Sequence, residues 1–141
     1  MRYAILLAYN GAGYGGWQMQ KNSITVQEKL EAAAKDLFGK RVCITASGRT
    51  DSGVHAAGQV CHFDAETAIP PEKIADALNM RLPEDISVLS SVAAPEAFDA
   101  NRSAKKKTYC YRMYLSPRRN PIKDKTSVWV KGGADISKLK H

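Results

Sequence analysis

The pattern of apolar and polar positions predicts a chain in which strands alternate with helices. Residues 2–9 are largely apolar and run into a cluster of glycines, which is typical of a buried strand that ends in an irregular loop. Further strands are predicted where apolar residues alternate with polar ones or β-branched residues gather. These segments are residues 42–47, 59–64, 86–92 and 108–115.

Two helices are predicted between these strands. Thr25 and Glu28 have the spacing of a capping box, and apolar residues then recur at helical spacing until Gly39. The second helix begins at the Pro70–Pro71 pair and ends before Pro83. The order β-α-β-β-α-β predicts an α+β fold of the ferredoxin-like type, an antiparallel sheet with helices on one face plus an added strand.

The length of 141 residues favours one domain with its own core. We expect the ferredoxin-like unit over residues 1–115, followed by a basic loop and tail over residues 116–141 that contain one short strand around 128–130. No apolar run reaches the roughly 18 residues that a membrane span needs, and the start of the chain lacks a signal-peptide pattern. These features favour a cytoplasmic protein.

Positive charge is concentrated at one end of the chain. The net charge is +7, but residues 1–100 have a balance of −3 and residues 101–141 a balance of +10. Tyr109, Tyr111 and Tyr114 lie within this basic stretch. Clustered cations bind phosphates and planar side chains stack on bases, so the mixture favours RNA binding. A solvated basic tail is the alternative.

The cysteines favour neither a disulfide framework nor a metal site. Cys43, Cys61 and Cys110 are odd in number and far apart. We expect reduced thiols in or near the core, and no bound metal.

The candidate for chemistry is Asp51, in the stretch ASGRTDSGVHAAGQV. Gly48 and Gly53 permit a tight, exposed bend around it, and Arg49 lies close enough in sequence to pair with its carboxylate. A carboxylate held in this way is suited to act as a nucleophile, a general base or a metal ligand, and the local sequence does not choose among these roles. The simpler alternative is a surface Asx turn.

The whole stretch resembles a known family. Residues 48–56 fill every fixed position of the G-R-T-D-x-G-V-H-A signature of tRNA pseudouridine synthases of the TruA type. Residues 9–18, YNGAGYGGWQ, are similar to the family's YDGxxYxGWQ, with Asn10 in place of the aspartate, and KTYCY at 107–111 resembles its basic-x-Tyr-x-Tyr segment. Three motifs in the expected order make the resemblance specific.

The resemblance implies that Asp51 is the nucleophile of an isomerase that converts uridine to pseudouridine without a cofactor. Whether Asp51 attacks C6 of the base or C1′ of the sugar stays open. The resemblance also implies that Arg49 is the partner of Asp51 and that Tyr109 lies against the target uracil. We expect Tyr111 to support the core instead, because it is two residues further along the same predicted strand.

Other residues are expected to contact the RNA or to support the site. Arg102, Lys107 and Arg112 are candidate substrate contacts, and His55 has a supporting role there. The family usually has an arginine where this chain has Asn101, and whether Arg102 replaces it stays open. A further candidate is a hydrolase triad of residues 47, 51 and 55, which is disfavoured because triads are assembled from separate elements. Trp17 is expected in the core.

By resemblance, the substrate is tRNA, modified at positions 38 to 40 of the anticodon stem-loop, and the family protein is a homodimer. Family members are longer and have a second, similar domain that faces the first across a cleft. We therefore expect this chain to correspond to the first domain, with little turnover by itself. The alternative is a non-catalytic RNA-binding module of ferredoxin-like fold.

Overall fold

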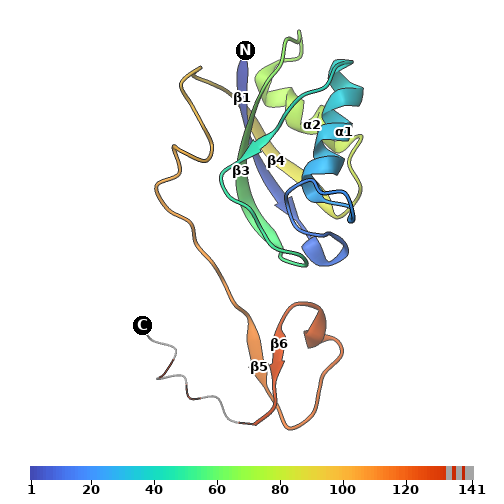
Figure 1. Cartoon of the computed structure of the whole chain (residues 1–141), viewed down its shortest axis with the longest axis vertical. Coiled ribbons are helices and arrows are strands. Elements are labelled where there is room, and N and C mark those ends of the chain that lie inside the picture. The colour runs from blue at the N-terminus through green and yellow to red at the C-terminus, as the bar shows by residue number, and fades with distance from the viewer. Residues whose placement is uncertain (133–134, 136–137, 139–141) are drawn as a thin grey trace. The chain divides into compact units, whose positions relative to one another are not determined.

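The structure is a computed structural model that describes residues 1–132, 135 and 138. The chain divides into two compact units, Met1–Lys105 and Lys106–His141. The first unit contains the strands and helices of the predicted ferredoxin-like fold (Figure 1). No helix in the described part of the chain has the length and apolar character that crossing a membrane requires.

The first unit is built on a four-stranded antiparallel sheet. The strands are β1 (Arg2–Tyr9), β2 (Thr45–Ala46), β3 (Ala56–Asp64) and β4 (Ile86–Ala94), in the spatial order β2-β3-β1-β4. The central strand β1 places Ile5 opposite Cys61 of β3 and Ser91 of β4. This sheet, together with the β-α-β-β-α-β order, confirms the predicted fold class.

Strand β2 is shorter than the predicted segment 42–47. Its pairing with β3 is limited to Thr45 opposite His62 and Ala46 opposite Cys61. The preceding backbone amide, that of Ile44, donates a hydrogen bond to the Glu31 carboxylate at 3.1 Å instead of to a strand. The alternating pattern therefore predicts correctly which side chains are buried. At Ile44, however, the backbone N–H is bonded by the Glu31 side chain of the helix and not by a neighbouring strand.

Two helices cover one face of the sheet (Figure 1). Helix α1 (Val26–Phe38) begins as predicted, because the Thr25 hydroxyl accepts the Glu28 N–H at 3.3 Å, and it ends at Gly39. Helix α2 (Ile74–Asn79) follows a short 3-10 turn, η2 (Pro71–Lys73), and ends before Pro83. Both helix predictions are confirmed.

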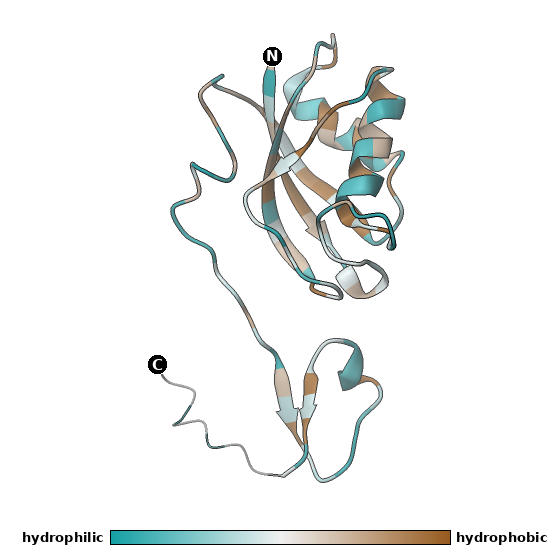
Figure 2. Ribbon diagram, viewed as in Figure 1, coloured by the Kyte–Doolittle hydropathy of each residue, from teal (hydrophilic) through white to brown (hydrophobic). Residues whose placement is uncertain are grey.

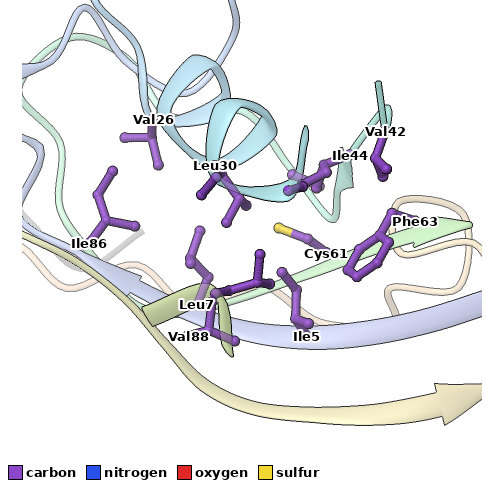
Figure 3. Packing of buried hydrophobic residues seen from close by; sticks show 14 of the residues in the cluster. Ile5, Leu7, Val26, Leu30, Val42, Ile44, Cys61, Phe63, Ile86 and Val88 are labelled. Carbon is purple, nitrogen blue, oxygen red and sulfur yellow. The ribbon is translucent and has the colours of Figure 1, made fainter. Parts of the chain in front are cut away.

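The core lies between the helices and this face of the sheet (Figures 2 and 3). Alternate side chains of β1, including Ile5 and Leu7, point to the side of the sheet that α1 covers, and each buried side chain of this size contributes about 1.5–3 kcal/mol. Trp17 is buried, as predicted. Burial raises the pKa of the Cys61 thiol to about 12 and keeps it protonated.

The other two cysteines correct the expectation of core or near-core thiols. Cys43 and Cys110 are exposed. Cys43 lies between buried Val42 and buried Ile44, so the alternation of the chain turns its side chain outward.

The second unit contains the parallel strands β5 (Met113–Leu115) and β6 (Val128–Val130), with a 3-10 turn, η3 (Lys123–Lys125), between them. The prediction of a short strand at 128–130 is confirmed. The strand predicted over 108–115 starts only at Met113, and it pairs with β6 instead of extending the four-stranded sheet. Tyr111 is 84% exposed, so the expectation that it supports a core is wrong. The charged run before it offers no apolar face to bury.

Candidate functional site

Asp51 lies in the connection between β2 and β3, here called the Asp51 loop (residues 47–55). The Val54 N–H donates to the Asp51 carbonyl at 3.2 Å, which makes Asp51 the first residue of a tight turn. Gly53 occupies the third position of this turn with φ of +79°, a conformation that favours glycine. The Asp51 residue is exposed. The predicted glycine bend is therefore present, with Gly53 as the glycine that it requires.

A second segment, the glycine loop (residues 10–17), packs against the Asp51 loop. This segment includes the 3-10 turn η1 (Gly11–Gly13). The Trp17 N–H donates to the Thr50 carbonyl at 3.0 Å, and the Gly53 N–H donates to the Tyr14 carbonyl at 3.2 Å. Backbone hydrogen bonds of this kind fix the turn without depending on a solvent-exposed side chain.

The two loops approach so closely that side chains are excluded between them. A Cβ atom added to Gly16 would lie 2.5 Å from the Thr50 carbonyl oxygen, and Gly16 has φ of +91°. A Cβ on Gly11 would meet the backbone of Val54 even more closely. The glycines of the amino-terminal motif are therefore needed for contact with the Asp51 loop.

Two buried polar side chains lie beneath the Asp51 loop. The Tyr9 hydroxyl is 2.7 Å from Thr50 Oγ1, and it donates to Gln59 Oε1 at 3.3 Å. Burial raises the pKa of Tyr9, and the hydrogen bond with Thr50 acts in the opposite direction. Tyr9 thus remains a neutral hydroxyl that ties the Asp51 loop to strands β1 and β3.

Arg49 and Asp51 open onto the same hollow. Its volume is about 450 Å³, and part of its wall is contributed by Gln18, Met19 and Gln20, the residues just beyond the glycine loop. Within the described residues Arg49 and Asp51 form no ion pair, although the sequence suggested one. Both charges are thus accessible to a ligand in the hollow.

His55 has a structural contact in this site. Its Nδ1 accepts the Gly11 N–H at 3.2 Å, which agrees with the expected supporting role. A contact of His55 with substrate stays a prediction. Among the residues that the structure describes, no hydrogen bond links the side chains of Ser47, Asp51 and His55, and no group of three or more His, Cys, Asp and Glu is arranged to hold a metal ion.

Arg102 is presented on a separate turn of the first unit. Asp99 Oδ1 accepts the N–H groups of Arg102 and Asn101, both at 2.9 Å, and these bonds hold the pKa of Asp99 below its usual value. The Ala100 N–H donates to His62 Nδ1 at 3.0 Å and fastens the turn to β3. Arg102 itself is exposed. Asn101 thus takes part in the turn through its backbone N–H, which donates to Asp99.

The remaining predicted contacts belong to the second unit. Lys107, Tyr109 and Arg112 precede β5, and all three are exposed, Tyr109 by 69%. Neither Lys107 nor Arg112 has an ion-pair partner among the described residues, whereas Arg119 pairs with Asp124 at 2.9 Å. The meeting of Tyr109 with Asp51 in the active enzyme stays a prediction.

Sequence reasoning missed the residues that support the Asp51 loop. Tyr14 is a fixed residue of the amino-terminal motif, but the motif does not indicate that its hydroxyl donates to Asp85 Oδ1 at 2.6 Å. Asp85 lies outside every motif. The signal in the sequence was the position of Asp85 immediately before the strand predicted over residues 86–92.

Comparisons with known proteins show the family of this chain. A family profile described as tRNA pseudouridine synthase matches residues 5–101. Proteins named tRNA pseudouridine synthase A are 38% identical over 96% of this chain in Geotalea uraniireducens, 42% identical over 96% in Ruminiclostridium cellulolyticum, and 47% identical over 84% in Syntrophomonas wolfei. The matches cover 55%, 55% and 47% of those proteins, so the chain spans about half the length of the relatives that it matches. The chain belongs to the tRNA pseudouridine synthase family.

Proposed function

We propose that this chain supplies the catalytic aspartate of an enzyme that isomerises uridine to pseudouridine at positions 38, 39 and 40 of the tRNA anticodon stem-loop. The observation that carries the proposal is the exposed Asp51 at the first position of a turn that is hydrogen-bonded to the glycine loop. The relatives of this chain are named tRNA pseudouridine synthase A, which supports tRNA as the substrate.

The chemistry needs a group that bonds to the nucleotide and later leaves. The N1–C1′ bond breaks and the C5–C1′ bond forms, while C5 loses a proton and N1 gains one, so uridine and its product are isomers and the reaction is redox-neutral. An ionised Asp51 adds to the nucleotide at C6 or C1′ and is released at the end. Because atoms and electrons balance within the nucleotide, the reaction requires no cofactor.

Arg49 and Tyr109 have separate roles in the proposal. Arg49 is on the same hollow as Asp51, where its guanidinium is placed to hold the carboxylate or a nearby phosphate once substrate enters. Tyr109 is exposed and free to lie against the uracil ring. The target uridine must leave the helical stack before either contact forms, which costs a few kcal/mol.

The basic side chains offset that cost. Lys107, Arg112 and Arg102 are exposed and are proposed to contact tRNA phosphates, and His55 is proposed to support the Asp51 loop. The active form is proposed to be a cytoplasmic homodimer of the longer protein. The 141-residue chain alone is expected to fold and to bind RNA weakly, with strong salt dependence and little turnover.

The test measures pseudouridine in anticodon stem-loops that carry uridine at position 38, 39 or 40. It uses a protein of the relatives' full length that contains this chain, as wild type and as Asp51→Asn. The proposal expects product at those positions from wild type, and unchanged RNA binding without product from the variant. Cleaved RNA would indicate a hydrolase, and binding without product from wild type would indicate an RNA-binding module.

A further inference from the structure

The buried side chain of Tyr14 forms a partly buried hydrogen bond with a carboxylate outside the family motifs. Tyr14 is 7% exposed, and its hydroxyl donates to Asp85 Oδ1 at 2.6 Å. Burial raises the pKa of Tyr14, and the bond to Asp85 raises it further, so the phenol stays a donor. A hydrogen bond from a neutral donor to a carboxylate is about twice as strong as one between neutral groups.

Asp85 is itself fixed on the sheet. It lies immediately before β4, whose first residue, Ile86, pairs with Tyr9 of β1. The Asp85 carbonyl accepts the N–H of Asn10 at 2.9 Å. One residue therefore holds the glycine loop at both its beginning, through Asn10, and its middle, through Tyr14.

The backbone of Tyr14 continues this connection to the turn that carries Asp51. The Tyr14 carbonyl accepts the Gly53 N–H at 3.2 Å and the Ser52 hydroxyl at 3.3 Å. Ser52 and Gly53 are the two central residues of the turn that Asp51 opens. A continuous chain of contacts thus runs from Asp85 through Tyr14 to the residues beside Asp51.

We propose that Tyr14 and Asp85 form a clamp that positions the Asp51 turn for reaction, an inference that rests on the proposed function of Asp51. Neither side chain touches the nucleotide in this account, so both are positioning residues. An attacking carboxylate must be held near its target carbon, and misplacement by about 1 Å can cost roughly a hundredfold in rate. Through Asp85, which lies immediately before β4, the clamp fixes the position of the Asp51 turn relative to the sheet.

The first experiment measures the clamp without substrate. Hydrogen exchange of the Gly53 and Val54 amides is followed in the 141-residue chain as wild type, Tyr14→Phe, Asp85→Ala and Asp36→Asn. Asp36→Asn is the matched control, because it removes another exposed carboxylate, one that pairs with Arg81 at 2.7 Å. The proposal expects both clamp variants to exchange these amides about tenfold faster or more, and the control to match wild type. Unchanged exchange in Asp85→Ala overturns it.

Asp85→Ala is the decisive variant if Tyr14→Phe fails to fold, because the Asp85 residue is exposed and its removal leaves no core cavity. Asp85→Asn retains an oxygen acceptor and is expected to restore most of the protection. A variant that lowers the melting temperature but leaves Gly53 exchange unchanged would indicate general packing and would contradict the clamp.

The second experiment measures turnover on the anticodon stem-loop in a protein of the relatives' full length. Tyr14→Phe and Asp85→Ala are each expected to lower kcat by about 10- to 100-fold with KM unchanged, and the double variant is expected to lose no more than one single variant. Wild-type kcat in both overturns the proposal. If wild type itself forms no pseudouridine, the proposed function fails, and the exchange experiment alone decides the clamp.

Discussion

The residues around Asp51 in the first unit and the residues before β5 in the second unit are held in contrasting ways. In the first unit, the backbone and side chains around Asp51 are hydrogen-bonded to the glycine loop, to β1 and to β3. In the second unit, Lys107, Tyr109 and Arg112 are exposed, and neither cation has an ion-pair partner in the described part of the chain. The turn of the proposed nucleophile is thus held by hydrogen bonds, whereas the two cations proposed to contact RNA have no ion-pair partner in the described part of the chain.

This difference corresponds to two demands of the proposed reaction. Bond formation requires a fixed nucleophile, since a misplaced group loses rate steeply. Phosphate binding depends mainly on the number of positive charges that release counterions, and it tolerates mobile side chains. Substitutions in the first unit are therefore expected to change rate or stability, and substitutions in the second unit to change affinity.

The largest effect is expected when the contact between the two loops of the first unit is broken. Gly16→Ala places a methyl group 2.5 Å from the Thr50 carbonyl in a backbone conformation with positive φ, so it should destabilise the fold by about 2–4 kcal/mol and abolish product. Gly13→Ala is the control, because a Cβ there meets nothing within 4 Å. Denaturant unfolding of both variants is the measurement, and equal stability would contradict the packing account.

The second prediction concerns charge in the second unit. Lys107→Ala combined with Arg112→Ala should lower RNA affinity and reduce the slope of log K against log salt by about one unit for each phosphate that is no longer neutralised. Lys29→Ala with Lys35→Ala removes the same charge from exposed positions of α1 and should leave the slope unchanged. RNA titrations at several salt concentrations measure both. An equal reduction of slope in the two pairs would show that only net charge matters.

A smaller effect is expected from the hydroxyl beneath the Asp51 loop. Thr50→Val removes one of the two hydrogen-bond partners of the Tyr9 hydroxyl and keeps the side-chain shape, so it should cost about 1 kcal/mol of stability and lower kcat more than it raises KM. Thr45→Val, at an exposed position of β2, is the matched control. Thermal unfolding and steady-state turnover are the readouts, and wild-type behaviour of Thr50→Val would remove Tyr9 from the support of the Asp51 loop.

The smallest effect concerns the turn that carries Arg102. Burial, and then the charge of Arg2, hold the pKa of His62 below its usual value, although Asp99 and Asp64 act in the opposite direction. As the pH falls, His62 is therefore protonated in the unfolded chain before it is protonated in the folded chain. Its contribution to the free energy of unfolding is fully present above a pH of about 6.5 and is lost as the pH drops below that value. His62→Gln should flatten this part of the stability profile. Urea unfolding at pH 7.5 and 5.5 tests it, and an unchanged slope in His62→Gln would contradict it.

Sequence reasoning reached the fold and the position of Asp51 because both depend on local signals. The capping pair Thr25 and Glu28 gave the start of α1, and Gly53 gave the bend at Asp51. Sequence reasoning failed where a hydrogen bond joins two elements that are separate in the sequence. The Glu31 carboxylate accepts the Ile44 N–H, and the Asp85 carboxylate accepts the Tyr14 hydroxyl. Such contacts join residues far apart in the chain and leave no periodic pattern to detect.

If Asp51 is the nucleophile and its turn holds it in place, pseudouridine formation in a single turnover should depend on its carboxylate. The measurement uses an anticodon stem-loop with excess protein of the relatives' full length, as wild type, Asp51→Asn and the carboxylate control Asp36→Asn. We predict that all three bind the RNA with similar affinity, that Asp36→Asn reacts at the wild-type rate, and that Asp51→Asn forms no product. Product from Asp51→Asn at the wild-type rate would contradict the account.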